Sequence, residues 1–234
     1  MEPAFPCRVC AGALELARRG RLGAATAAAF APTCHETGAH GDLLRCRQCG
    51  TLQQPTLPRG DALLALYRDM SDPAYLDEDA RRGYAAEGLE PARAAAAHAR
   101  DVLGLTVREV AVEDPALDGE RFDVVVLTDV LEHVEQPGAT LDRCAQLLTD
   151  DGLLLVVTPD PASPTARLAG GRWWGLLPAH VCLIPHRTLL ELLIGRGLVI
   201  AADVPFVRSF TPGYWLAGLA ERSPALGRLL GRGG

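Results

Sequence analysis

The sequence contains no lysine, so arginine supplies all 23 of its basic side chains. This absence excludes catalysis through a lysine Schiff base and the lysine of a phosphate-binding P-loop. Positive charge is also scarce, because 29 acidic side chains leave a formal net charge of −6. A general nucleic-acid binder needs a basic surplus to neutralise phosphates. We therefore expect no nucleic-acid partner. A small-molecule substrate is expected instead, with a protein partner or a homo-oligomer as further candidates.

Long apolar runs are absent as well. No stretch approaches the ~20 consecutive apolar residues that cross a bilayer. The first residues, MEPAFPC, have neither the basic nor the apolar region of a secretory signal peptide. We therefore expect no membrane association and a cytoplasmic protein. In that reducing compartment the seven cysteines indicate metal ligands or buried thiols rather than disulfides.

Four of the cysteines form two CxxC motifs, CRVC and CRQC. Each motif places two thiolates on one turn, and two such turns make a tetrahedral site suited to Zn²⁺. A closed site of four thiolates is structural rather than catalytic. The predicted ligands are Cys7, Cys10, Cys46 and Cys49. The segment between the motifs offers three residues that could each replace one of these cysteines, namely Cys34, His35 and His40.

A buried strand near the middle of the chain organises the rest of the predicted fold. Residues 123–127 carry four consecutive apolar side chains after the aspartate, three of them β-branched, which is typical of an inner strand of a parallel sheet. The ligand crevice of an open α/β sheet lies beyond the carboxyl ends of its strands. The residues expected at that crevice are Thr128, Asp129, Glu132 and His133.

Helices and strands alternate around this central strand. Helices are predicted over residues 61–67, with Asp61 as the N-cap, and over 92–103, 138–148 and 185–194. Strands are predicted over residues 83–90, 106–112, 153–158 and 198–202. The alternation predicts an α/β fold with a Rossmann-like, doubly wound, mostly parallel sheet and a small N-terminal zinc-binding module. A short amphipathic helix is expected around Trp215.

Three segments leave alternatives open. Residues 13–30 are rich in alanine and arginine and fit either a helix or a loose insert. Trp173 and Trp174 form either an apolar lid over a ligand or a patch that packs on the protein's own surface. Glu132 and His133 belong either to a site or only to the cap of the segment that follows them.

Together these motifs resemble the class I S-adenosylmethionine-dependent methyltransferases, and most closely the bacterial branch with an N-terminal zinc-binding CxxC/CxxC module. The resemblance runs from Cys7 to about Arg208. It rests on the two CxxC motifs, an acid-ending strand, FDVVVLTDVLEHVEQP, DDGLLLVVTPD, and a histidine ahead of PHRTLLELLIGRGL. It implies a zinc-binding module over residues 1–58, a methyltransferase-like α/β domain over 59–208, and a C-terminal helix and tail over 209–234.

The resemblance also implies how the cofactor is held. Glu90 matches the acid that binds the ribose hydroxyls of S-adenosylmethionine, and a carboxylate at a strand end can accept both hydroxyl protons. Glu113 or Asp114 matches the position on the adenine side. Asp129 begins the motif that lines cofactor and substrate.

The catalytic residues implied by the resemblance are Glu132, His133 and His180. His133 is expected to act as a general base because an unperturbed imidazole titrates near neutral pH, and His180 matches a histidine on the substrate side. The implied reaction transfers a methyl group from S-adenosylmethionine to a small molecule such as a sugar or a secondary-metabolite intermediate.

The glycine-rich turn that such enzymes use to bind their cofactor has no counterpart between Asp61 and Glu90. In the family, the strand before that turn lies between the strand that ends at Glu90 and the one that begins at Asp123. Three explanations are open. In the first, the chain is a degenerate relative whose flanking strands pair directly and which serves as a non-catalytic binding or scaffold subunit. In the second, the sequence has lost this segment. In the third, the cofactor binds by another route, with a partner chain supplying the strand.

Overall fold

The computed structural model describes residues 5–21, 26–30, 40–55, 57–69 and 87–206 of the 234-residue chain. The chain divides into two compact units, Met1–Ile200 and Ala201–Gly234. Within the second unit the description covers only residues 201–206, which are exposed and lie outside any helix or strand. The helix expected around Trp215 lies outside the described residues.

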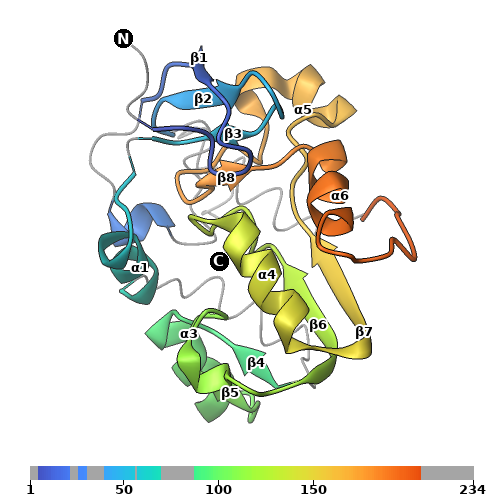
Figure 1. Cartoon of the computed structure of the whole chain (residues 1–234). Coiled ribbons are helices and arrows are strands. Elements are labelled where there is room, and N and C mark those ends of the chain that lie inside the picture. The colour runs from blue at the N-terminus through green and yellow to red at the C-terminus, as the bar shows by residue number, and fades with distance from the viewer. Residues whose placement is uncertain (1–4, 22–25, 31–39, 56, 70–86, 207–234) are drawn as a thin grey trace, which may run out of the picture. The chain divides into compact units, whose positions relative to one another are not determined.

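The N-terminal part of the chain forms a four-stranded antiparallel sheet in the order β1-β2-β3-β8 (Figure 1). Its strands are β1 (Leu14–Arg18), β2 (Leu43–Cys46), β3 (Leu52–Gln53) and β8 (Cys182–Leu183). The last strand comes from the far end of the chain, where Cys182 pairs with Gln53. The sequence left open whether residues 13–30 form a helix or a loose insert. The segment instead begins with strand β1, which neither alternative anticipated.

A small apolar cluster lies beside this sheet. It joins the 3₁₀ turn η1 (Ala27–Phe30) to helix α1 (Asp61–Arg68), and the ring centroids of Phe30 and Tyr67 are 5.0 Å apart in an edge-to-face arrangement. Helix α1 matches its prediction closely. However, Gly60 occupies the N-cap and Asp61 is the first helical residue, so the prediction of Asp61 as the N-cap is wrong.

The middle of the chain contains a first parallel pair of strands. Strand β4 (Gly88–Leu89) pairs with β5 (Val107–Arg108), and helix α3 (Arg93–Asp101) connects them. Strand β5 is far shorter than the strand predicted over residues 106–112, and β4 falls within the strand predicted over 83–90, of which residues 83–86 lie outside the described residues. Beyond β5 the chain turns through the 3₁₀ helix η2 (Pro115–Leu117), which Asp114 caps by accepting a hydrogen bond from the Ala116 amide.

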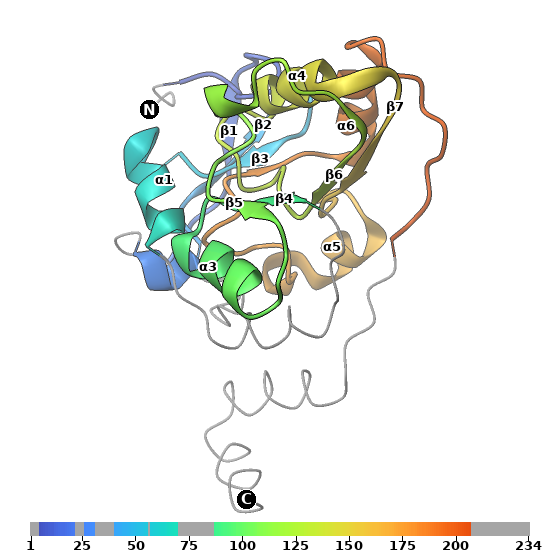
Figure 2. The ribbon, with the colours of Figure 1, turned by 90° about the horizontal axis from the view of Figure 1, so that it is seen from below.

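A second parallel pair consists of β6 (Phe122–Thr128) and β7 (Leu148–Val157), connected by helix α4 (Pro137–Leu147). One face of this pair packs against α4 and against helix α6 (His186–Ile194) (Figure 2). Leu127 of β6 packs there in one buried cluster with Leu141 and Cys144 of α4, which confirms the prediction that Cys144 lies in the core.

The opposite face of β6 and β7 is exposed. Val124 and Val126 are 55% and 54% exposed, and their neighbours on β7, Leu153 and Leu155, are 53% and 49% exposed. The sequence predicted strands buried on both faces. That prediction is wrong for the part of the chain that the structure describes, because only one face of the pair carries covering helices there.

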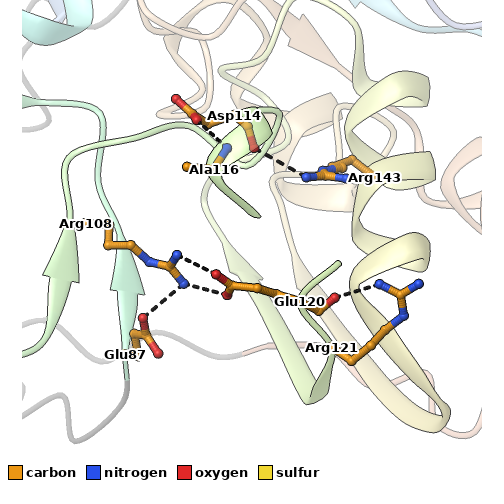
Figure 3. Close-up of polar contacts among 7 residues, drawn as sticks. All are labelled: Glu87, Arg108, Asp114, Ala116, Glu120, Arg121 and Arg143. Atoms are coloured by element: carbon orange, nitrogen blue, oxygen red, sulfur yellow. Dashed lines mark hydrogen bonds and ion pairs between the residues drawn. The ribbon is translucent and has the colours of Figure 1, made fainter. Parts of the chain in front are cut away.

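The two parallel pairs form separate sheets. Within the described ranges, β4 and β6 are not hydrogen-bonded to each other. They are the two strands that would flank the strand before the absent glycine-rich turn, so the direct pairing offered as one explanation for its absence does not occur there. An ion-pair network connects the end of β5 to the start of β6 instead: Arg108 donates hydrogen bonds of 2.8 and 2.7 Å to Glu120 and also contacts Glu87 at 3.1 Å (Figure 3). The architecture is thus α/β with parallel strands, but its sheet is split.

The chain between β7 and α6 carries the two tryptophans. Helix α5 (Pro164–Ala169) continues into the 3₁₀ turn η3 (Gly170–Arg172). Trp173 is 4% exposed and packs in the core beneath the N-terminal sheet, whereas Trp174 is half exposed. For Trp173 the structure therefore favours packing within the protein over a lid. The strand predicted over residues 198–202 is not formed, since these residues lie outside any strand.

Among the helices that the structure describes, none combines the length and the apolar character needed to cross a membrane.

Candidate functional site

The first candidate site is the cluster of four cysteines. Cys7 and Cys10 lie on a turn ahead of β1, while Cys46 ends β2 and Cys49 follows it. The sulfur atoms of Cys7 and Cys49 are 3.6 Å apart, those of Cys10 and Cys46 are 3.4 Å apart, and all four lie within 4.8 Å of one another. Sulfurs at about 2.3 Å from a tetrahedral Zn²⁺ would be ~3.8 Å apart. The four thiols are therefore positioned to hold one such ion.

Neither of the two other cysteines described is part of this cluster. Cys144 and Cys182 are fully buried, and burial raises the pKa of Cys144 to about 11 and that of Cys182 to about 12. His40 is also buried, with Nδ1 2.7 Å from the carbonyl oxygen of Gly41, and does not belong to the four-cysteine group. Cys34 and His35 lie outside the described residues.

The second candidate site brings together Glu132, His133 and His180. One ligand atom from each lies within 4.8 Å of the other two. Glu132 and His133 follow the carboxyl end of β6, and His180 lies two residues before β8. A backbone hydrogen bond connects the two segments that carry these residues, because the Cys182 amide donates to the carbonyl oxygen of Glu132 at 3.1 Å. All three predicted catalytic residues thus meet in one place.

Glu132 is 1% exposed. Its Oε2 accepts a 2.8 Å hydrogen bond from Thr158, which follows the end of β7, and its Oε1 is buried without a hydrogen-bond partner. Helix α4 begins without any side-chain cap. The reading of Glu132 and His133 as mere helix caps is therefore not supported.

The His133 ring is held by Tyr67 and by the backbone of Ala179. Tyr67 donates a 2.8 Å hydrogen bond to the carbonyl oxygen of Ala179, and Nδ1 of His133 lies 3.2 Å from that oxygen and 3.1 Å from the tyrosine hydroxyl. The tyrosine hydroxyl can donate to the carbonyl oxygens of Ala179 and His133, and the Ala179 oxygen can only accept, so its contact with Nδ1 of His133 favours the tautomer with the proton on Nδ1. The neutral ring then presents an unprotonated Nε2.

His180 is fixed in the same tautomer. Its Nδ1 lies 2.7 Å from the carbonyl oxygen of Gly175, which can only accept, so Nδ1 carries the proton. The His133 and His180 rings meet edge to face at 4.8 Å. Across the described part of the chain, no hydrogen bond reaches Nε2 of either ring.

A glutamine of the N-terminal sheet region clamps the loop that carries His180. Nε2 of Gln54 lies 3.1, 3.1 and 2.9 Å from the carbonyl oxygens of Leu177, Pro178 and His180. Its Oε1 accepts a 2.7 Å hydrogen bond from the amide of Gly41. Gln54 is 1% exposed, so these bonds form away from solvent.

Burial changes the acid–base properties of the cluster. It lowers the pKa of His133 to about 3, with a further contribution from His180, and lowers that of His180 to about 4. It raises the pKa of Glu132 to about 7. Burial therefore moves the pKa of His133 away from the near-neutral value of an unperturbed imidazole, because an imidazolium ion is poorly solvated in this interior. Near neutral pH Glu132 is the better proton acceptor.

The acids predicted to bind the cofactor occupy separate positions. Glu90 follows β4 and accepts a 2.7 Å hydrogen bond from the amide of Ala92, at the start of α3. Glu113 accepts a 2.5 Å hydrogen bond from Thr140 of α4, and Asp114 caps η2. Asp129 follows β6 in a left-handed conformation, with φ of 53°. These four acids are not members of the Glu132, His133 and His180 group.

Three residues of the site were missed by the sequence analysis. Thr158 stands at the carboxyl end of a predicted strand, so the strand-end rule could have identified it. Tyr67 and Gln54 gave no such signal, because their partners lie far away in the sequence.

Comparisons with known proteins give one family and several partial relatives. A protein-family model described as a methyltransferase domain matches residues 67–202. A ubiquinone biosynthesis O-methyltransferase of Cereibacter sphaeroides is 42% identical over 74 residues, which are 30% of this chain and 30% of that protein. One from Rhodopseudomonas palustris is 40% identical over 85 residues, 33% of this chain and 32% of that protein. The chain thus spans about a third of the length of the curated relatives it matches.

Solved structures give weaker similarities. A methyltransferase of Thermotoga maritima described as S-adenosylmethionine-dependent, a possible histamine N-methyltransferase, aligns with a TM-score of 0.42 at 23% identity, covering 47% of this chain and 53% of that one. An O-methyltransferase family protein of Burkholderia thailandensis aligns with a TM-score of 0.39 at 23% identity, covering 51% of this chain and 39% of that one.

Proposed function

Because the chain belongs to the methyltransferase-domain family, we propose that it transfers a methyl group from S-adenosylmethionine to a small-molecule acceptor. The observation that carries this proposal is the meeting of Glu132, His133 and His180 in one buried group beyond the carboxyl end of β6. This is the edge of a parallel sheet at which substrates bind. The partial relatives named O-methyltransferases support a hydroxyl as the acceptor group.

When bound, S-adenosylmethionine supplies a methyl group that is already electrophilic. The protein's part is to align the acceptor and to deal with its proton. Glu132 and the two histidines would contact the acceptor hydroxyl, and Glu90 would accept hydrogen bonds from the ribose hydroxyls. Asp129, with Glu113 or Asp114, would line the rest of the cofactor site. The described residues contain no glycine-rich turn for the methionine end.

Titration calorimetry with S-adenosylmethionine and S-adenosylhomocysteine tests the proposal. We expect micromolar binding, weakened at least ~10-fold by Glu90→Ala, because a hydrogen bond to a charged group contributes about 1.5–3 kcal/mol. Asp101→Asn, at the exposed end of α3, is the matched control and should bind as the unaltered protein does. Absence of binding at millimolar cofactor would contradict the proposal for this chain.

A non-catalytic binding or scaffold subunit is the second candidate. It is favoured by one observation, the separation of the β4–β5 and β6–β7 pairs into two sheets. The same titration distinguishes the two, because a subunit of this kind keeps its fold and its four-cysteine cluster but does not bind the cofactor.

We further propose that the four-cysteine cluster holds a structural Zn²⁺. Its sulfur separations support this assignment.

A further inference from the structure

The Glu132, His133 and His180 group has the composition of a metal site as well as of a catalytic cluster. Two imidazoles and one carboxylate are a recurrent ligand set for divalent ions of the first transition series. We propose that these three side chains bind one such ion, in addition to the ion held by the four cysteines. The two groups share no residue.

The hydrogen bonds around the cluster leave the right atoms available. Nδ1 of His133 and Nδ1 of His180 both lie against backbone carbonyl oxygens, which favours the tautomer with the proton on Nδ1 and the lone pair on Nε2. Thr158 occupies Oε2 of Glu132 and leaves Oε1. Outer-shell hydrogen bonds of this type orient the ligands in known metal sites and set the histidine tautomer.

The remaining oxygen of Glu132 supplies an independent observation. Oε1 is buried and has no hydrogen-bond partner, on a residue that is 1% exposed. A buried carboxylate oxygen without a partner is costly and requires an explanation. A bound cation provides one, because it satisfies that oxygen and compensates the buried charge in the same contact.

The distances and the donor atoms define the kind of ion. The three ligand atoms lie within 4.8 Å of one another. Ligands at about 2.1 Å from a metal are separated by roughly 3–3.5 Å, so an inward rotation of roughly 1 Å would close the site. Imidazole nitrogen favours Zn²⁺, Co²⁺ or Fe²⁺ over Mg²⁺ and Ca²⁺, which prefer all-oxygen sites. Three protein ligands would leave positions open for an acceptor oxygen.

An ion at this position would change how the acceptor is activated. A hydroxyl bound to a divalent metal loses its proton at lower pH than it does in water. This consequence depends on the proposed methyl transfer, whereas binding of the ion does not. Metal binding is therefore measured on its own, without cofactor or acceptor.

The test uses the full chain loaded with one equivalent of Zn²⁺, so that the thiolates are occupied, and titrates it with CoCl₂ by calorimetry. Co²⁺ lies below Zn²⁺ in general affinity and does not displace it. We expect one Co²⁺ per Zn²⁺-loaded chain, with an absorption spectrum that lacks sulfur-to-cobalt charge transfer. No Co²⁺ binding, or a thiolate spectrum, would overturn the proposal.

Variants assign the bound Co²⁺ to its ligands. Glu132→Gln and His180→Ala should each weaken Co²⁺ binding at least ~10-fold, while His186→Ala, an exposed histidine at the start of α6, should leave it unchanged. Where circular dichroism shows that a ligand variant does not fold, Thr158→Val takes its place. It removes only the hydrogen bond to Oε2 and should weaken binding about 10-fold. Unchanged affinity in the folded variants refutes the site.

Discussion

The four-cysteine cluster and the Glu132, His133 and His180 cluster are assembled in opposite ways. The cysteines come in two CxxC pairs, each within one turn, and only the pairing of nearby strands is needed to join them. The second cluster joins residues that follow β6 to a histidine ahead of β8, and it depends on a long-range clamp by Gln54. Local spacing therefore defines the first cluster, and tertiary packing defines the second.

The largest effect is expected from removing cysteines. The double variant Cys7→Ser, Cys46→Ser takes one thiolate from each CxxC turn and should abolish stoichiometric zinc and unfold the N-terminal sheet, because structural zinc contributes directly to folding. Metal analysis and circular dichroism measure the two results. Cys144→Ser, in the core of α4, is the control that should retain zinc. Unchanged zinc in the double variant would reject the four-cysteine assignment.

An intermediate effect is expected at Gln54, which clamps the loop that carries His180. Gln54→Leu leaves the carbonyl oxygens of residues 177, 178 and 180 without their side-chain donor and the Gly41 amide without its acceptor. We expect a loss of about 4 kcal/mol or more in the free energy of unfolding, measured with urea, since four buried groups are left unpaired and each costs ~1–3 kcal/mol.

Gln146→Leu, an exposed glutamine on α4, is the matched control for this change. Zinc content should remain at its normal value in folded Gln54→Leu, while Co²⁺ binding at the second cluster should weaken. If both metal sites were unaffected and stability were unchanged, Gln54 would not position His180.

The smallest effect is expected within the second cluster. Tyr67→Phe removes the hydroxyl that donates to the Ala179 carbonyl and lies beside His133. A single hydrogen bond contributes about 0.5–1.5 kcal/mol, and the Ala179 carbonyl keeps Nδ1 of His133 as a partner. Urea unfolding should show a loss of about 1 kcal/mol. A loss as large as that of Gln54→Leu would mean that the tyrosine, not the glutamine, is the main support of the cluster.

The contrast between local spacing in the four-cysteine cluster and tertiary packing in the second cluster explains which features could be predicted from the sequence. The CxxC cysteines and the strand before Asp129 were identifiable because their signals are local, namely a fixed spacing and an apolar run. The burial of His133, and hence its low pKa, was not identifiable, because it results from packing against Tyr67 and His180. The exposed outer face of β6 was also unexpected, since strand composition does not report which elements cover a sheet.

Strand β8 has a consequence for the synthesis of the protein. The N-terminal sheet obtains its last strand from residues 182 and 183, and Gln54 bonds across 126 positions to His180. During translation the four clustered cysteines leave the ribosome long before these partners do. Long-range pairing of this kind forms late and slowly. The first sheet to be synthesised is therefore among the last to be completed, and an N-terminal fragment that ends before residue 183 lacks the strand that closes it.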